Sequence, residues 1–568
     1  MSAISGRWSA SAAAFRDVLS LGTQRRVLSA WLLFNAAEWA IWVAILVYAY
    51  GASGPASVGL VAVAQLVPAA LAAPLTARLS ERMAPERALT LAYLVIGLAM
   101  AATGAAMAGG LSPLLIYALA AIVVAAYTSV RPIQTSILPA LVGRAEQLTA
   151  ANALSTILEG TGVLVGPLLC GVIIGFASPS AVYVVAGLAT LGAALLIGGA
   201  SVRRDAWVRT ATVPTPTPTP PPSPTPASPV AQGLRAVTAE RSRMLAIVLL
   251  ATRFGAAAAM DVLLVLAAVE LLGMGGPGAG YLAAAIGLGW VLGGATTLVI
   301  VGRPRLTALT VVGALIWAIP IVGVALVVQP LPALVLLVGA GVGLAVVDVA
   351  VRTVLQRLVT TTQLASVFGI AEGASMAGAA VGALMAGVLV AVVGLTAAIM
   401  VAGVLLPMVA IAVLRTVSRG EAGVPIPFRE IALLRRIPLF APVPAPALEA
   451  AAAALIPVTM PAGTVVIRQG EVGDRFWLVD TGEVDVDQGG SVIARLGPGA
   501  SFGELALIRD IPRTASVVAV TDVILFALDR EAFLLTLTAS PRAAHEASAV
   551  AARHLEHDRA AQGSRERG

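Results

Sequence analysis

The chain has 568 residues, of which 58% are hydrophobic and only 12% are charged, and its mean hydropathy is +0.93. Soluble domains contain roughly 45–50% apolar and about 25% charged residues, so this composition excludes an ordinary soluble protein. The net charge of +6 divides into +9 up to Glu421 (22 Arg, 13 acids) and −3 from Val424 onward (14 Arg, 17 acids), so the basic balance does not indicate nucleic acid binding.

The first 26 residues are predicted to form a cytoplasmic N-terminal segment. They contain four Arg residues but no apolar run that ends in a cleavage site, so we expect no removable signal peptide. The single cysteine, Cys170, excludes an intramolecular disulfide. Insertion into the membrane is therefore expected to begin with the first apolar stretch.

Twelve mostly apolar stretches follow, and each approaches or exceeds the roughly 20 residues that a transmembrane helix needs. They lie at 27–50, 56–77, 88–109, 112–138, 147–176, 179–201, 243–272, 278–301, 306–328, 332–357, 364–392 and 395–414. Alternate connecting segments carry no charge, whereas the others contain the Arg residues. The positive-inside rule therefore places both termini in the cytoplasm and predicts a multi-pass protein of the cell (inner or plasma) membrane.

The spans divide into two six-helix bundles, at 27–201 and 243–415, joined by a cytoplasmic linker at 202–242. Within the linker, residues 214–229 read PTPTPTPPPSPTPASP, which excludes helix or sheet and predicts an extended spacer. Two such halves favour a transporter with a substrate path at their interface. The alternative, a passive membrane anchor, would hardly need twelve spans.

Two short motifs on the cytoplasmic side indicate a family. ARLSERMAPERAL, after the second span, resembles the G-x-L-x-D-R-x-G-x-R motif of the major facilitator superfamily through Arg82 and Arg87, although it lacks the glycines and the aspartate. RPIQ in the fourth span resembles the R-x-x-Q motif of proton-coupled exporters in that superfamily, through Arg131 and Gln134. The resemblance covers roughly residues 20–415 and is closest to drug and macrolide exporters.

The fifth span carries a more specific motif. GVLVGPLLCG resembles the antiporter motif G-x-x-x-G-P-x-x-G-G at Gly162, Gly166, Pro167 and Gly171. Gly162 and Gly166 lie one turn apart and let a neighbouring backbone approach closely, while Pro167 removes a backbone hydrogen bond and is expected to bend the helix. Plain tight packing, without antiport, is the alternative interpretation.

Ionisable residues inside spans are costly and mark candidate transport residues. We expect these to include Glu38, Glu159 and Arg253 near the middle of the membrane, Asp261 at intermediate depth, and Arg131, Asp348 and Arg352. Asp348 and Arg352 are spaced i, i+4, so they share a helix face on which their charges can neutralise each other. For Arg131, a buried role and snorkelling to the cytoplasm stay open.

Proton coupling needs a carboxylate that binds and releases a proton as the substrate cavity changes sides. Glu38 is the first candidate, with Asp261 and Glu159 behind it. A structural ion pair, or a cavity-lining acid that never titrates, is the alternative, and the sequence does not separate them.

The composition changes again at Pro425. Charges return, and β-patterned runs such as TVVIR, RFWLVD and EVDVD are separated by glycines. We predict a linker at 416–429, a soluble α+β module at 430–545, and a C-terminal helix and tail at 546–568, with a lid helix around 541–560.

Residues 430–545 resemble a cyclic nucleotide-binding domain, a β-roll of kinase regulatory subunits, ion channels and bacterial transcription activators. The most specific match is FGELALIRDIPRTAS at 502–516, which resembles the phosphate-binding cassette F-G-E-[LI]-A-L…P-R-[TSA]-A. The resemblance implies that the nucleotide-binding residues are Gly503, Glu504, Leu505, Arg513, Thr514 and Ala515.

The residue types in this cassette suit a cyclic phosphodiester. Arg513 can give the phosphate a charge-assisted hydrogen bond, and Gly503 allows close backbone approach before a short helix that begins near Glu504. The resemblance implies that Glu504 accepts a hydrogen bond from the ribose 2′-hydroxyl. It also implies that the Thr514 hydroxyl makes cyclic GMP a credible ligand beside cyclic AMP. We expect Trp477 in the core of the roll.

The sequence thus predicts a twelve-span α-helical transporter of the major facilitator fold with a C-terminal α+β cyclic nucleotide-binding β-roll. We expect a proton-coupled exporter of drug-like or amphipathic molecules that is regulated by cyclic AMP or cyclic GMP. The alternatives are a non-transporting nucleotide receptor, a lipid or lysolipid translocator, and a roll that has lost its ligand. The sequence shows no catalytic triad, metal cluster, Walker loop or helix-turn-helix, so we expect no enzyme activity, no metal and no nucleic acid partner. The substrate and the oligomeric state stay open.

Overall fold

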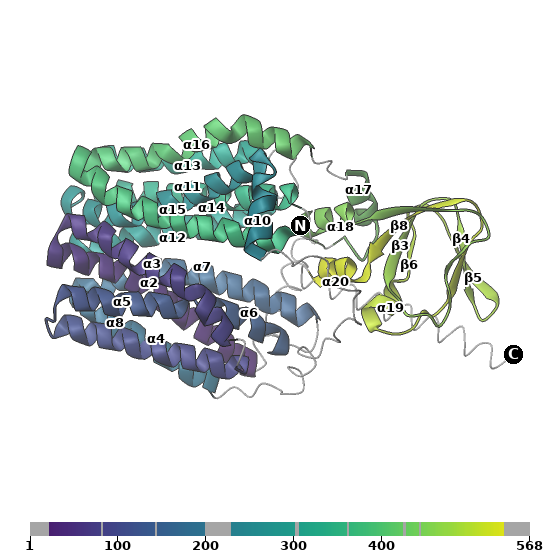
Figure 1. Cartoon of the computed structure of the whole chain (residues 1–568), viewed down its shortest axis with the longest axis horizontal. Helices are drawn as coiled ribbons and strands as arrows, with labels where there is room; N and C mark the ends of the chain where they lie inside the picture. The colour runs from purple at the N-terminus through teal and green to yellow at the C-terminus, as the bar shows by residue number, and fades with distance from the viewer. Residues whose placement is uncertain are drawn as a thin grey trace. The chain divides into compact units, whose positions relative to one another are not determined.

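A computed structural model of the chain describes residues 22–80, 83–141, 145–198, 229–300, 306–359, 363–423, 428–441, 443 and 445–538. They form two compact units (Figure 1). The helical unit comprises the described residues of Gly22–Leu141 and Leu154–Val424, and the roll unit includes those from 428 to 538. Most of the predicted N-terminal segment, the Pro-rich tract up to 228 and the predicted lid helix lie outside the described residues.

The first half of the helical unit consists of helices that mostly begin at a proline, which is preorganised for the first helical position. They are α2 (Gly22–Ser53), α3 (Pro55–Ser80), α4 (Pro85–Ala108), α5 (Pro113–Tyr127), α6 (Val130–Leu141), α7 (Ala145–Phe176) and α8 (Pro179–Gly198). The fourth predicted span is divided between α5 and α6. Hydroxyls at the break, on Thr128 and Ser129, donate to the carbonyl oxygens of Ala125 (2.7 Å) and Ala126 (2.8 Å), and such bonds compete with the helical ladder.

The second half repeats the pattern after a short additional helix. Its elements are α10 (Pro229–Thr238), α11 (Arg241–Leu266), the π-helix η1 (Ala267–Leu271), α12 (Gly275–Ile300), α13 (Leu306–Leu326), α14 (Pro330–Leu358), α15 (Leu364–Val393) and α16 (Leu395–Gly423). Helix α10 lies inside the segment predicted as linker and packs against α15. Helix α16 continues to Gly423, through half of the next segment predicted as linker.

Every predicted apolar stretch overlaps a helix of the structure. Among the described residues, 10 helices are long and apolar enough to cross a membrane, and Pro55–Ala69 is a shorter apolar helix. The chain is therefore a multi-pass membrane protein, as predicted. The count of twelve spans stays a prediction.

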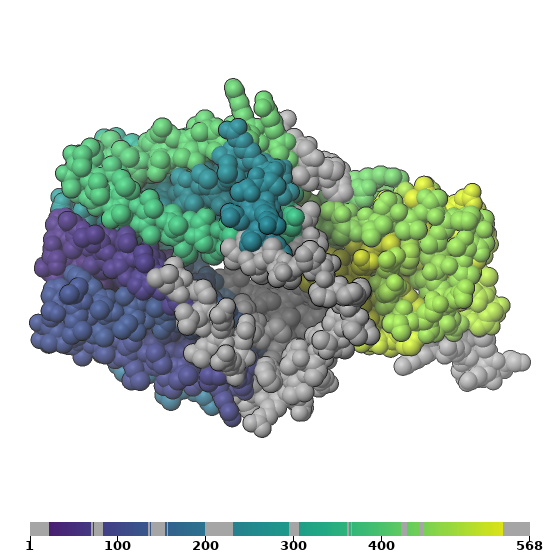
Figure 2. Space-filling view, in the orientation of Figure 1, coloured from purple at the N-terminus to yellow at the C-terminus, as the bar shows by residue number. Residues whose placement is uncertain are grey.

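The two halves pack against each other through several pairs of helices. Helix α15 packs against α3, and the purple and green atoms of these segments touch in Figure 2. A Cβ atom at Gly59 would lie 2.7 Å from the carbonyl oxygen of Ala383, and one at Gly287 would lie 2.7 Å from that of Val163. Glycine therefore permits the close approach of helices from opposite halves.

The roll unit is an α+β domain built from short strands. Its helices are α17 (Phe428–Arg436), α18 (Ala445–Ala453), α19 (Glu504–Arg509) and α20 (Arg530–Thr538), and its strands are β1 (Ile456–Met460), β2 (Val465–Ile467), β3 (Arg475–Thr481), β4 (Val484–Gln488), β5 (Ser491–Leu496), β6 (Ser501–Phe502), β7 (Ser516–Ala519) and β8 (Val523–Asp529). Two antiparallel sheets run β1-β8-β3-β6 and β2-β7-β4-β5. This arrangement confirms the predicted soluble fold.

Apolar side chains fill two places in the roll unit. Phe440, Phe476 and Phe533 form one cluster with the helices, and Phe476 and Phe533 stack at 4.9 Å between ring centres. Trp477 stacks on Phe502 at 6.5 Å in the second cluster, formed by strand residues, so its predicted place in the core is confirmed. The roll unit thus has its own core, which is what an independently folding domain requires.

Candidate functional site

The predicted cassette in the roll unit is a tight turn followed by a short helix. Gly503 has a φ of +89°, which is left-handed, and α19 begins at the next residue, Glu504, as the sequence predicted. A Cβ atom at position 503 would lie 2.6 Å from Nη1 of Arg513, so glycine is needed for the arginine to come this close. Glu504 is buried beside them.

Arg513 is the buried charge of this site, with a side chain that is 4% exposed. It donates hydrogen bonds to the carbonyl oxygens of Gly503 (2.8 Å) and Arg475 (2.7 Å), and its Nη2 lies 3.6 Å from Oδ1 of Asp474. Burial lowers the pKa of Arg513, an effect that Asp474 opposes, and the guanidinium stays charged. Because a guanidinium carries more N–H donors than these contacts use, donors remain for an anion.

The loop before β3 holds the cassette in position. The backbone nitrogen of Arg513 donates to the carbonyl oxygen of Glu471 (2.8 Å), and that of Gly470 donates to the carbonyl oxygen of Arg513 (2.9 Å). Arg530 donates to the carbonyl oxygen of Gly473 at 3.4 Å. Arg513 is therefore held by hydrogen bonds of both its backbone and its side chain.

The remaining predicted cassette residues are partly buried: Leu505, Thr514 and Ala515. The carbonyl oxygen of Thr514 accepts a hydrogen bond from Nε2 of Gln488 at 3.3 Å. Sequence reasoning missed Asp474 and Arg475, although Arg475 begins the β-patterned run RFWLVD and Asp474 directly precedes it. Their role depends on which atoms face Arg513, and the residue types alone do not give this.

In the first half of the helical unit, Arg131 is the centre of a charged cluster. It donates to Glu159, and its Nη2 lies 4.0 Å from Oε2 of Glu38. The guanidinium also lies 5.9 Å from the ring centre of Trp31. The side chain of Arg131 is 46% exposed, so this cluster is more open than a fully buried ion pair. The structure thus brings together three predicted residues from α2, α6 and α7.

The second half holds a more buried cluster. Arg253 lies between the rings of Phe254 and Trp290, at 4.3 and 4.8 Å from their centres, and its Nε is 3.5 Å from Oδ1 of Asp348. Asp348 also pairs with Arg352 at 3.3 Å, as the i, i+4 spacing predicted. Two arginines therefore share one carboxylate. Arg352 reaches a further acid that was not predicted, Glu372, at 3.6 Å.

Two hydrogen bonds join α2 to the second half. Nε1 of Trp42 donates to Oδ2 of Asp261 at 3.1 Å, and the hydroxyl of Tyr50 donates to Oε1 of Glu270 at 2.9 Å. The structure therefore places Asp261 at the interface between the halves. Sequence reasoning missed both aromatic partners, because Trp and Tyr in an apolar helix look the same whether they face the core or a carboxylate.

The glycines of the antiporter-like motif lie on two sides of α7, where α2 and α12 pack against it. Cβ atoms at Gly162 and Gly166 would lie 2.6 and 2.5 Å from atoms of α2, and one at Gly171 would lie 2.8 Å from an atom of α12. These glycines therefore permit the close helix packing that their spacing predicts. Pro167 lies inside the continuous helix α7, and the bend it predicts stays a prediction.

No group of three or more His, Cys, Asp and Glu residues that could hold a metal ion occurs in the described part of the chain. Ion pairs link the candidate transport residues Arg131, Arg253 and Arg352 to acids of the helical unit, and in the roll unit Asp474 lies beside Arg513. The two units thus offer different chemistry: paired ions inside a helical bundle, and a cation held by the backbone of an α+β domain.

Comparison with solved structures finds similarity to Catabolite Activator Protein from Thermus thermophilus, at 33% identity over 23% of this chain and 63% of that one, with a TM-score of 0.21. The regulatory domain of Toxoplasma gondii PKA with cAMP is 22% identical over 26% of this chain and 56% of its own (TM-score 0.21). The sensor domain of the transcriptional regulator DNR from Pseudomonas aeruginosa is 22% identical over 23% and 92% (TM-score 0.22). This chain spans 45% to 63% of the length of the first structures it matches.

Two family models match the chain, one in each unit. The model of the cyclic nucleotide-binding domain matches residues 457–539. The model of the Major Facilitator Superfamily matches residues 27–371, which is more than half of the chain. The chain therefore belongs to the Major Facilitator Superfamily and carries a C-terminal domain of the cyclic nucleotide-binding fold.

Proposed function

We propose that the chain is a proton-coupled secondary exporter of drug-like or amphipathic small molecules, and that a cyclic nucleotide bound to its roll unit regulates transport. The fusion of a superfamily bundle with a nucleotide-binding fold supports regulated transport. We place the chain in the inner or plasma membrane with both termini in the cytoplasm, where the nucleotide would reach the roll. No metal, nucleic acid or enzyme activity is part of the proposal.

The observation that carries the proposal is the buried guanidinium of Arg513 with N–H donors to spare. A cyclic phosphodiester is a compact monoanion, and charge-assisted hydrogen bonds to it are stronger than neutral ones. We assign nucleotide binding to Gly503, Glu504, Leu505, Arg513, Thr514 and Ala515. The ligand is cyclic AMP or cyclic GMP, and the Thr514 hydroxyl is the group that would favour the guanine base.

We assign transport and coupling to the charged residues of the two halves: Glu38, Arg131, Glu159, Arg253, Asp261, Asp348 and Arg352. Glu38 and Glu159 share Arg131, so loss or gain of a proton on either changes the charge of the cluster. Asp261 accepts a hydrogen bond from Trp42 across the halves, and a protonated carboxyl group accepts more weakly. This contact supports Asp261 as a coupling carboxylate beside Glu38.

Reconstituted vesicles test the proposal. Accumulation of a fluorescent amphipathic dye should depend on an imposed proton gradient. Its rate should change when cyclic AMP or cyclic GMP is present on the side of the membrane that the roll unit faces. Nucleotide binding without movement of any dye or lipid would favour the membrane receptor instead. Movement of a labelled lysolipid but not of the dye would favour the lipid translocator.

A further inference from the structure

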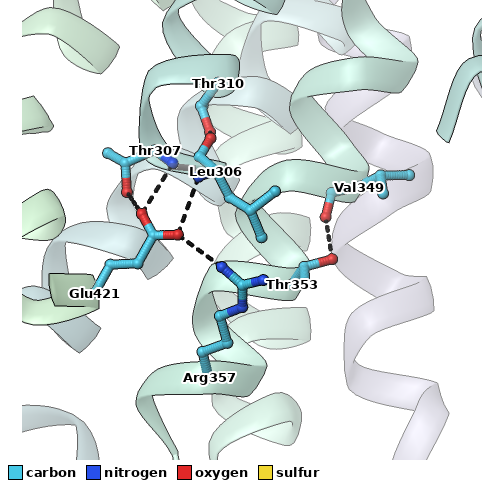
Figure 3. Close-up of polar contacts among 7 residues, drawn as sticks. All are labelled: Leu306, Thr307, Thr310, Val349, Thr353, Arg357 and Glu421. Atoms are coloured by element: carbon cyan, nitrogen blue, oxygen red, sulfur yellow. Dashed lines mark hydrogen bonds and ion pairs between the residues drawn. The ribbon is translucent and has the colours of Figure 1, made fainter. Parts of the chain in front are cut away.

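Near the end of α16, a buried carboxylate holds three helices together (Figure 3). Glu421 is 5% exposed, and it accepts hydrogen bonds from the backbone nitrogens of Leu306 (3.0 Å) and Thr307 (3.1 Å). It also accepts from the hydroxyl of Thr307 (2.7 Å) and from Nη1 of Arg357 on α14 (2.9 Å). We call these residues the α16 junction: Leu306, Thr307, Arg357 and Glu421.

The chemistry of the junction makes it an all-or-none contact. Leu306 and Thr307 are the first two residues of α13. At this end of a helix the backbone N–H groups have no partner within the helix, and the helix dipole favours an anion. The carboxylate of Glu421 satisfies them, and Arg357 balances its charge. A small displacement of α16 would leave buried polar groups unsatisfied, so intermediate positions are disfavoured. The junction therefore has two states, formed or broken.

The neighbouring residues tie further helices to the same place. A Cβ atom at Gly420 would lie 2.5 Å from that of Ser242, so α16 touches the start of α11. Arg243 donates to the carbonyl oxygen of Leu358 on α14 (2.7 Å) and to that of Ala236 on α10 (3.1 Å). The ends of α10, α11, α14 and α16 thus form one connected set.

The junction belongs to the helical unit, and its residue Glu421 lies close in sequence to the roll unit. Helix α16 ends at Gly423 and α17, the first helix of the roll unit, begins at Phe428, so four residues (424–427) separate them. In the other direction, α14 carries Arg357 together with Arg352 and Asp348 of the second-half charged cluster. One rigid helix therefore connects the junction to residues that we assign to transport.

We infer that the contact between Glu421 and Arg357 relays the nucleotide state of the roll unit to the charged cluster on α14. The inference rests on the proposed function and adds the route of regulation to it. A nucleotide-induced movement of the roll displaces the end of α16, which forms or breaks the junction. Helix α14 then changes the position of Asp348 and Arg352, because it carries these two residues as well as Arg357.

The test uses the full chain in vesicles with the substitution Glu421→Gln. The glutamine keeps the size of the side chain and one acceptor oxygen for the donors of α13, but it has no charge for Arg357. We expect unchanged affinity for cyclic AMP and cyclic GMP, a lower stability because a buried ion pair is broken from one side, and the transport rate of the broken junction both with and without nucleotide. The transport rates with and without nucleotide should therefore be equal in this variant, so that their ratio is one.

Arg419→Gln is the matched control, because this residue is exposed and lies two positions before Glu421 on the same helix. It should keep the wild-type ratio. If Glu421→Gln does not fold, the double substitution Glu421→Met and Arg357→Met replaces the buried pair by apolar side chains of similar size, which proteins often tolerate. It should also lose the nucleotide response.

Two outcomes separate this inference from the function on which it rests. A wild-type protein that transports but ignores nucleotide would overturn the regulation itself. A wild-type protein that responds to nucleotide, with a Glu421→Gln or double variant that responds equally, would overturn only the relay.

Discussion

The roll unit and the helical unit each bury an arginine, but they support it in different ways. Arg513 is 4% exposed and donates to two backbone carbonyl oxygens. Arg253 is 2% exposed and lies between Phe254 and Trp290, with Asp348 at 3.5 Å. Within the described residues, Nε and Nη2 of Arg253 have no hydrogen-bond partner. Arg513 is therefore held by hydrogen bonds to the backbone, whereas Arg253 is held by contacts with two rings and by an ion pair that it shares with Arg352.

This difference suits the two functions that we propose. A receptor for a small anion benefits from a cation that is already in place, because little ordering remains to be done on binding. An arginine in a transport path benefits from the freedom to exchange partners, and Asp348, which it shares with Arg352, allows such an exchange. The surroundings of each arginine, rather than the residue type, therefore distinguish a ligand-binding site from a site in a transport path.

The largest effect is expected for Asp348→Asn, which leaves Arg253 buried without its anion. Breaking a buried ion pair from one side costs about 3–5 kcal/mol, so the free energy of unfolding in detergent should fall by that amount. Glu372→Gln is the control, because Glu372 is 54% exposed and its ion pair should contribute little. Equal stability of the two variants would show that Arg253 does not depend on Asp348.

Arg513→Ala tests the other side of the comparison. Hydrogen bonds to charged groups contribute about 1.5–3 kcal/mol each, so loss of Arg513 should lower nucleotide affinity at least about 100-fold and abolish binding at ordinary concentrations. Calorimetry on a fragment of residues 425–568 measures this, since the roll unit has its own core. Arg509→Ala, at an exposed position of α19, should bind like the parent. Unchanged affinity of Arg513→Ala would remove the site assignment.

The sequence predicted those parts of the two sites whose residues lie close together in the chain. Gly503, Glu504 and Arg513 fall within one short segment, so residue type and spacing suffice to place them. The pairing of Asp348 with Arg352 follows from helix geometry alone. The exporter subtype, the span count and the coupling residue stay predictions.

The contacts that the sequence could not predict join residues far apart in the chain. Trp42 meets Asp261, and Glu421 meets Arg357, only because whole helices pack side by side. The position of Glu421 in the sequence gives no sign of this role, since an acid near the end of an apolar helix is ordinarily solvated. The break at Thr128 and Ser129 was missed because both residues also occur within helices.

A third arginine, Arg131, extends the comparison, since it is far more exposed than the other two. If its partner Glu38 carries the coupled proton, Glu38→Gln should abolish gradient-driven accumulation while downhill exchange persists, because glutamine hydrogen-bonds but does not titrate. Asp261→Asn is the companion variant. Uphill transport that survives in Glu38→Gln and fails in Asp261→Asn would move the coupling role to Asp261.

The smallest effect concerns an exposed pair of the roll unit. A hydrogen bond from Arg495 lowers the pKa of Asp485, so the pair stabilises the fold above the unfolded pKa of about 4 and this contribution is lost as the pH falls through the lower folded value. Asp485→Asn should therefore weaken the fragment slightly at neutral pH and leave its stability unchanged at strongly acidic pH. Denaturation curves at both pH values measure the difference, and a larger deficit in acid would contradict the assignment.

The central claim is that the roll unit senses a nucleotide and the helical unit transports. Deletion of residues 425–568 tests it most directly, in vesicles that contain either the full chain or the truncated chain. The account predicts that both transport the dye under a proton gradient and that cyclic nucleotide changes the rate of the full chain only. A truncated chain that still responds to nucleotide, or a full chain that transports without any response, would contradict it.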